Sequence, residues 1–218
     1  MSDEMVPTQG TWIGRLLPWI AALAVGLGFW LGFQMMRPPG VENIQLQAGT
    51  ALPQRRPLAP FELVDDSGKA FTLADLEGRW SFLAFGYTLC PDICPTTLAT
   101  LNAIDQELKN RSARAAREFV FVSIDPERDS PQRLKEFLAF FNPQFRGVTA
   151  PEKRLRPFTQ QLGIPYARVE GQSTALGYLM DHSGAILLVD PKARLAAIFS
   201  PPHEPRKMAA DFLALSDR

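Results

Sequence analysis

Two apolar runs, each about the length of one strand, constrain the fold of this chain most strongly. The first covers residues 81–87, and the second, EFVFVSI, covers residues 118–124. Apolar residues on successive positions, rather than on alternate ones, are typical of strands that are buried on both faces. The two runs therefore predict a central sheet with helices packed on both of its sides.

The segments around these runs predict the remaining elements. Residues 96–108 carry apolar side chains at helical spacing on one stripe. Ser130-Pro131 is typical of a helix N-cap followed by a first-turn proline, and predicts a helix that continues to Phe141. Further helices are expected over 151–162 and 205–215, and hairpins over 61–73 and 186–199. Strands that alternate with helices predict an α/β domain, a thioredoxin-like sheet with an N-terminal hairpin.

The N-terminal segment differs in character from the rest of the chain. Residues 16–36 carry no charge, and this length is enough to cross ~30 Å of hydrocarbon as a helix. A cleaved signal peptide has a shorter apolar region that ends in small residues, and no such pattern precedes Arg37. We therefore expect a tail at 1–15, one transmembrane anchor at 16–36, a Pro-rich linker at 37–60 and a globular domain at 61–218. Arginines flank both ends of the anchor, so charge does not decide its orientation.

The charge balance excludes one class of partner. Lys plus Arg and Asp plus Glu each number 23. No net field therefore exists to attract a polyanion over the whole surface, and we expect no nucleic-acid partner.

Two cysteines, Cys90 and Cys94, follow the first buried strand directly. They are expected at the carboxyl end of that strand, where open α/β sheets place their ligand sites. Pro95 suits a first helical position, which predicts Cys94 as the helix cap with a lowered thiol pKa. An inert buried pair is therefore disfavoured. A dithiol oxidoreductase usually has two residues between its cysteines, and this loop has three.

Two thiolates and one imidazole suit copper or zinc and exclude hard cations such as magnesium. The chain contains two histidines. His182, on the turn before the strand at 186–189, is the predicted third ligand, with Asp181 or a backbone group orienting its ring. His203 is expected to be a cap-region residue of the last helix. Four acidic residues could suggest acid/base chemistry: Asp92, Asp125, Glu127 and Asp129. A turn that ends a strand and caps a helix explains the last three better. A supporting role at the metal site stays open for Asp92.

From Gly49 onward the chain resembles the Sco/SenC family of copper-binding assembly factors. The resemblance rests on F-G-Y-T at 85–88, C-P-D-I-C-P at 90–95, D-P-E-R-D-S-P at 125–131 and D-H-S at 181–183. It implies a copper ion bound by Cys90, Cys94 and His182, with the two cysteines also forming a redox-active pair. Leu89 departs from many relatives, which have a histidine or another polar residue there.

The resemblance further implies a copper metallochaperone with thiol redox capability that assists maturation of the binuclear copper site of cytochrome c oxidase. The implied partner is the copper-site subunit of that oxidase, together with other copper chaperones or thiol reductants. The implied location is a single-pass membrane protein whose soluble domain lies in the bacterial periplasm or an equivalent extracytoplasmic compartment. The alternative is a membrane-anchored thiol:disulfide reductase that does not itself carry copper; a peroxidase is disfavoured because no further cysteine could resolve its intermediate.

Overall fold

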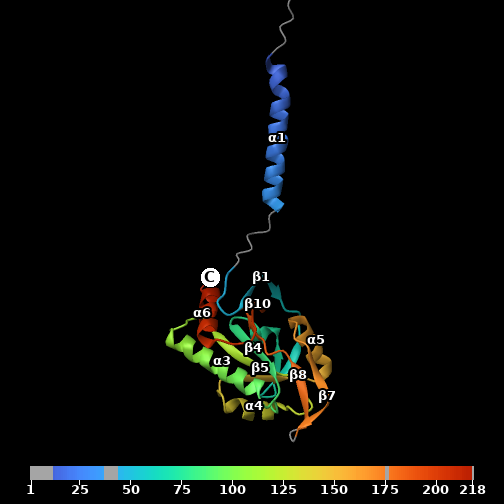
Figure 1. Cartoon of the computed structure of the whole chain (residues 1–218), viewed down its shortest axis with the longest axis vertical. Coiled ribbons are helices and arrows are strands. Elements are labelled where there is room, and N and C mark those ends of the chain that lie inside the picture. The colour runs from blue at the N-terminus through green and yellow to red at the C-terminus, as the bar shows by residue number, and fades with distance from the viewer. Residues whose placement is uncertain (1–11, 37–43, 175–176, 218) are drawn as a thin grey trace, which may run out of the picture. The chain divides into compact units, whose positions relative to one another are not determined.

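The computed structural model describes residues 12–36, 44–174 and 177–217 (Figure 1). It divides into two units, Met1–Glu42 and Asn43–Arg218. The first unit contains helix α1, Trp12–Met36, in which Trp19, Leu23 and Phe29 are exposed. None of the helices in the described residues is both long and apolar enough to cross a membrane. The predicted transmembrane helix at 16–36 is thus not confirmed.

The second unit is built on an eight-stranded mixed sheet with the order β1-β10-β9-β4-β5-β6-β2-β3. The central strands β4, β5 and β6 are parallel, and β9 pairs with β4 in the antiparallel direction. The strands of this sheet are β1 Thr50–Pro57, β2 Glu62–Asp65, β3 Ala70–Thr72, β4 Trp80–Gly86, β5 Arg117–Ser123, β6 Arg146–Thr149, β9 Ile186–Val189 and β10 Arg194–Phe199. Every residue of β4 is buried, as its unbroken apolar run predicts.

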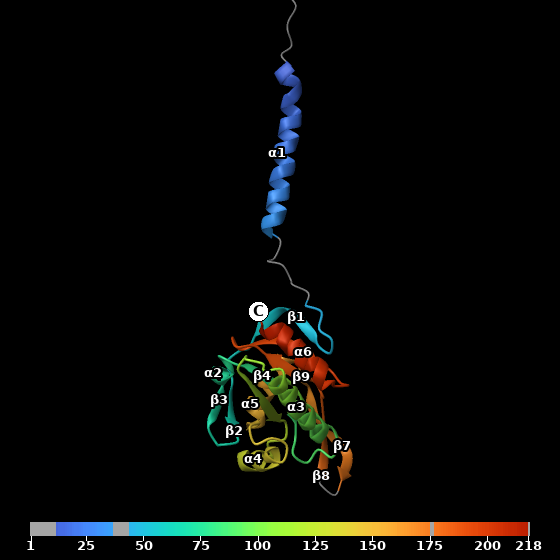
Figure 2. The ribbon, with the colours of Figure 1, turned by 90° about the vertical axis from the view of Figure 1, so that its left-hand side faces the viewer.

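Helices cover both faces of this sheet. Helices α3 and α6 pack together on one face, and α5 lies on the other (Figures 1 and 2). The helices of this unit are α2 Leu73–Leu76, α3 Ile93–Asn110, α4 Pro131–Ala139, α5 Glu152–Leu162 and α6 Pro205–Ser216. In the core, the ring of Phe82 stacks on Phe119 at 5.0 Å between centroids and contacts Phe212 of α6 at 5.5 Å. The predicted α/β class with a helix-covered sheet is confirmed.

The segment predicted as a linker, residues 37–60, contains strand β1. Residues 50–57 pair with β10 at the edge of the sheet. An edge strand tolerates Pro53 and Pro57 because an amide on its open side needs no ladder partner. The Asp211 carboxylate of α6 also accepts hydrogen bonds from the backbone N–H groups of Gln47, Ala48 and Gly49. The folded unit therefore begins before the predicted boundary at residue 61.

A separate two-stranded hairpin carries His182. It consists of β7, Tyr166–Thr174, and β8, Gly177–His182, which pair with each other and not with the large sheet. The sequence expectation was a turn at His182. In the structure His182 is the last residue of β8, where it pairs across the hairpin with Tyr166.

Candidate metal centre

The two cysteines lie at the carboxyl end of β4, in the loop that leads into α3. Helix α3 begins at Ile93 with Asp92 as its N-cap. The prediction that Cys94 is the cap is therefore wrong, and Cys94 lies in the first turn of the helix. Pro95 is tolerated there because first-turn amides have no partner within the helix. Cys94 is buried, with 1% of its surface exposed, whereas Cys90 is half-buried, and both are free thiols.

His182 turns one ring nitrogen toward the cysteines. Its Nε2 lies 3.7 Å from the Sγ of Cys94, and its Nδ1 lies 3.0 Å from the carbonyl oxygen of Ser183. A carbonyl can only accept, so Nδ1 carries a proton and donates a hydrogen bond to the Ser183 carbonyl. The group that orients the ring is therefore this backbone carbonyl, and not the exposed Asp181.

The three predicted residues come together. The sulfurs of Cys90 and Cys94 and a ring nitrogen of His182 all lie within 4.8 Å of one another. Ligand atoms that share one ion through bonds of about 2.0–2.3 Å lie at most about 4.6 Å apart. A small closure would thus place all three donors on a single ion, and the soft donor set fits copper or zinc.

The two thiols have opposite electrostatic properties. A hydrogen bond from the Cys94 thiol outweighs burial and, with bonds from His182 and from backbone N–H groups, lowers the pKa of Cys90 to about 3. The same hydrogen bond, together with burial, raises the pKa of Cys94. Burial opposes protonation of His182, but its interactions with the Cys90 thiolate and the Ser183 carbonyl raise its pKa. The metal-free pair thus holds one thiolate, on its more exposed cysteine.

Asp129 fixes the start of the cysteine loop. Its buried carboxylate accepts hydrogen bonds from the Thr88 backbone N–H at 3.0 Å, the Thr88 hydroxyl at 2.6 Å and the Ser123 hydroxyl at 2.6 Å. From the sequence this residue was interpreted as part of a turn. The turn does form, since the N–H groups of Arg128 and Asp129 donate to the carbonyl of Asp125. The carboxylate's contact with Thr88, 41 residues away in sequence, was not predictable from local pattern.

Tyr87 is a second supporting residue that the sequence did not reveal. Its hydroxyl accepts a hydrogen bond from the backbone N–H of Met180 at 3.3 Å. Its buried ring meets the His182 ring edge-on, with 6.1 Å between centroids. Tyr87 therefore contacts the strand that carries the histidine at two points.

The other sequence candidates lie outside the three-residue cluster. His203 donates from Nε2 to the Gly184 carbonyl at 2.9 Å, which agrees with a structural role before α6. Asp92 is exposed at the start of α3. Asp125 and Glu127 face a neighbouring cavity, where both accept from the Tyr178 hydroxyl.

Known proteins of the same architecture combine this fold with copper. The structure of ScoI of Arabidopsis thaliana with copper bound has 30% identity and a TM-score of 0.68, covering 72% of this chain and 95% of that one. The structure of ScoI of Bradyrhizobium japonicum with copper bound has 31% identity and a TM-score of 0.63, covering 72% and 97%.

Sequence comparisons point the same way. An SCO2-like protein of Rickettsia conorii is 37% identical over 148 residues, which are 68% of this chain and 71% of the relative. The model of the SCO1/SenC family matches residues 50–216, a range that includes both cysteines and His182. The chain therefore belongs to the SCO1/SenC family.

Proposed function

We propose that this chain binds copper through Cys90, Cys94 and His182 and supplies it to the copper-site subunit of cytochrome c oxidase. The observation that carries the proposal is the convergence of two thiols and one imidazole within 4.8 Å. Zinc accepts the same ligands. The copper-bound structures of the ScoI relatives favour copper as the ion.

The three residues have different parts in holding and releasing the ion. Cys94 is buried in the first turn of α3, and the carbonyl of Ser183 orients the ring of His182 with Nε2 toward the sulfur of Cys94. Cys90 is more exposed, and its low pKa keeps it a thiolate. A ligand from the partner would therefore displace the Cys90 sulfur first, and copper would leave by exchange of ligands.

Copper titration of the reduced full-length protein tests the ligand assignment. In competition with a chromophoric Cu(I) chelator under anaerobic conditions, we expect one copper per chain. Cys90→Ser or Cys94→Ser should abolish tight binding, and His182→Ala should weaken it at least tenfold. His203→Ala is the matched control, because that histidine lies outside the cluster. Copper binding that survives loss of both cysteines would refute the assignment.

Delivery requires a separate test. Copper-loaded protein mixed with the copper-free soluble domain of the oxidase subunit should lose its copper to that domain. In the control, copper supplied by a chelator in the same buffer should not load that domain. If copper stays on this chain while the subunit remains able to bind copper from solution, the delivery proposal is wrong.

A second candidate, thiol:disulfide reduction, is favoured by the unequal cysteines. The Cys90 thiolate would attack a partner disulfide, which forms a mixed disulfide and releases one partner thiolate. Cys94, giving up its proton, would then attack Cys90 and release the second partner thiolate, leaving a Cys90–Cys94 disulfide. That disulfide would consume the copper ligands, so oxidised protein should refuse copper and reductant should restore uptake. Rapid reduction of protein disulfides by the copper-free protein, lost in Cys90→Ser, would favour this function.

We also propose that α1 anchors the chain to a membrane, with the second unit on the extracytoplasmic side. The proposal rests on the uncharged stretch at 16–36 and on the exposed apolar side chains of α1. Full-length protein should stay with membranes after an alkaline wash, and removal of residues 1–42 should release it. Recovery of the full-length protein in the wash would refute the anchor.

A further inference from the structure

The large sheet positions the hairpin that carries His182 only in part. His182 ends β8, and the β7–β8 hairpin shares no ladder with the eight-stranded sheet that leads into the cysteine loop. The link 183–185 joins His182 to β9 of that sheet, so this short link and side-chain contacts together set the distance between the imidazole and the two thiols.

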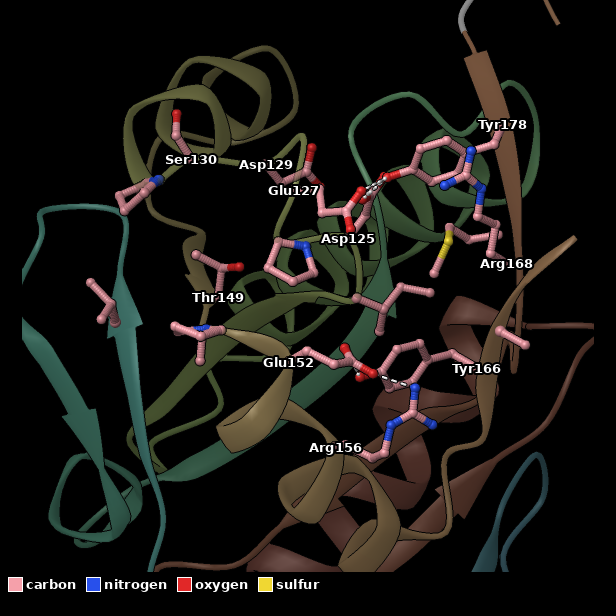
Figure 3. Close-up of a pocket in the computed structure, with 18 residues that line it drawn as sticks. Asp125, Glu127, Asp129, Ser130, Thr149, Glu152, Arg156, Tyr166, Arg168 and Tyr178 are labelled. Atoms are coloured by element: carbon pink, nitrogen blue, oxygen red, sulfur yellow. Dashed lines mark hydrogen bonds and ion pairs between the residues drawn. The ribbon is translucent and has the colours of Figure 1, made fainter. Parts of the chain in front are cut away.

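A cavity of about 760 Å³ separates part of this hairpin from the body of the domain (Figure 3). One wall is formed by hairpin residues, including Arg168 and Met180, and the other by the loops after β5 and β6, including Pro126 and Ala150. Close packing normally fixes one element against another. Close packing is absent across this cavity, so other contacts must hold the hairpin against the body of the domain.

Tyr166 supplies the fastening nearest the histidine. It lies directly across the hairpin from His182, and its hydroxyl donates to Glu152 Oε2 at 2.7 Å. Glu152 is the first residue of α5, which belongs to the body of the domain. The Arg156 guanidinium lies 5.0 Å from the centre of the Tyr166 ring.

Tyr178 makes a second contact between the hairpin and the body of the domain, above Tyr166 in Figure 3. Its hydroxyl donates to Asp125 Oδ1 at 2.7 Å and lies 3.2 Å from Glu127 Oε2. The guanidinium carbons of Arg128 and Arg168 lie 3.6 and 3.7 Å from the centre of its ring. Two guanidinium groups that close to one ring centre would overlap on a single face, so they flank the ring on both faces.

These contacts continue toward the metal centre. Arg128 forms an ion pair with Asp125 and lies 5.4 Å from the centre of the Tyr87 ring, whose edge meets His182. Burial raises the pKa of the Tyr166 and Tyr178 hydroxyls, so both stay protonated and can donate at neutral pH.

We propose that Tyr166 and Tyr178 are positioning residues, whose hydroxyl bonds to Glu152 and Asp125 hold the β7–β8 hairpin where His182 meets the thiols. The expected consequence is that these two hydrogen bonds tune copper affinity, and this consequence rests on the proposed function. Without them the hairpin populates positions in which the imidazole lies away from the sulfurs, and the three-ligand site is available only part of the time.

The test combines Tyr→Phe substitutions with His182→Ala in one cycle. Tyr166→Phe/Tyr178→Phe, which removes both hydroxyls and keeps both rings, should weaken Cu(I) binding about tenfold. In the His182→Ala background the same pair of substitutions should change the affinity less than twofold, because the tyrosines act through the histidine. An equal loss in both backgrounds would show a general structural effect and overturn the proposal.

Two further readouts separate this inference from the proposed function. In the metal-free reduced protein, the nuclear Overhauser effect between the His182 and Tyr87 rings should be strong in wild type and weak in the double variant. In the Cu(II) form, the nitrogen hyperfine coupling should decrease in the double variant. If wild type binds no copper but the ring–ring effect is lost in the variant, the copper proposal fails and the positioning role stands. If the variant keeps both the ring–ring effect and the wild-type affinity, the positioning role is wrong.

Ser81→Ala is the matched control. It removes a hydroxyl–carboxylate hydrogen bond of the same kind, to Glu118 at 2.8 Å, from the start of β4. It should lower stability without changing the ring–ring effect or the copper affinity.

Discussion

Gly86, the last residue of β4, leaves the space that the sulfur of Cys94 occupies. A Cβ at this position would lie 2.4 Å from Cys94 Sγ and 3.0 Å from two carbons of the Phe121 ring. Ordinary contact between such atoms needs about 3.5 Å, so in Gly86→Ala the sulfur would have to move by about 1 Å. Because Cys94 is buried, no solvent space receives it. We expect a loss of about 1–3 kcal/mol of stability from overpacking, and copper binding weaker by at least tenfold, about 1.4 kcal/mol.

Gly147→Ala separates the two effects. A Cβ at Gly147, in β6, would meet Leu134 Cβ at 2.9 Å and Leu138 Cδ1 at 3.0 Å, a smaller clash that does not involve the cysteines. Urea unfolding should show both variants destabilised. Anaerobic Cu(I) competition should show weaker binding in Gly86→Ala alone. Wild-type copper affinity in Gly86→Ala, or an equal loss in Gly147→Ala, would refute the view that Gly86 positions the sulfur.

Three further substitutions test other contacts. His203→Ala should cost about 1 kcal/mol of stability through the lost bond to a backbone carbonyl and should change copper affinity less than twofold; a tenfold loss would contradict its structural role. Burial acts to raise the pKa of Asp65, but hydrogen bonds from Ser67 and Arg146 lower it from 3.8 to about 2. The ionised Asp65 carboxylate therefore contributes about 2 kcal/mol to stability above pH 4, and this contribution is lost as the pH falls toward 2. In acid unfolding, the stability of Asp65→Asn should not show this decrease between pH 4 and pH 2. Asp211→Ala should lower the urea unfolding free energy by about 2–4 kcal/mol, because three backbone N–H groups lose one carboxylate acceptor; an unchanged midpoint would contradict this.

The parts of the fold that were predictable are those with a strong local pattern. The apolar runs gave β4 and β5, Ser130 does cap α4 by accepting from the N–H of Arg133, and the hairpin around Asp65 forms as β2 and β3. Strand β1 was missed because its prolines are typical of a linker, and its strand character depends on β10, which lies more than a hundred residues away. Local propensity cannot report such a pairing.

The three residues of the candidate site were predictable from the sequence, and the side chains that hold them in place were not. Cysteine spacing and the small number of histidines restricted the donor set to Cys90, Cys94 and His182, which the structure brings together. The unequal burial of the two cysteines follows from the start of α3 at Ile93, one residue before Cys94, and a cap assignment from sequence is uncertain by one or two residues. The contacts of Asp129 and Tyr178 join segments 41 and 53 residues apart, a separation at which side-chain partners cannot be deduced from residue types.

The clamp between Asp211 and residues 47–49 also defines a path for mechanical load. Tension that enters the second unit from its N-terminal side reaches three hydrogen bonds on one carboxylate of α6 and then the edge strand β1. The pairing of β1 with β10 is interrupted between Ala51 and Arg56, so this strand is held weakly along its middle. Under force the clamp and the edge strand would yield before the central strands carry any strain. A pull on residue 44 would therefore open this segment first and leave the geometry of the cysteine loop after β4 unchanged.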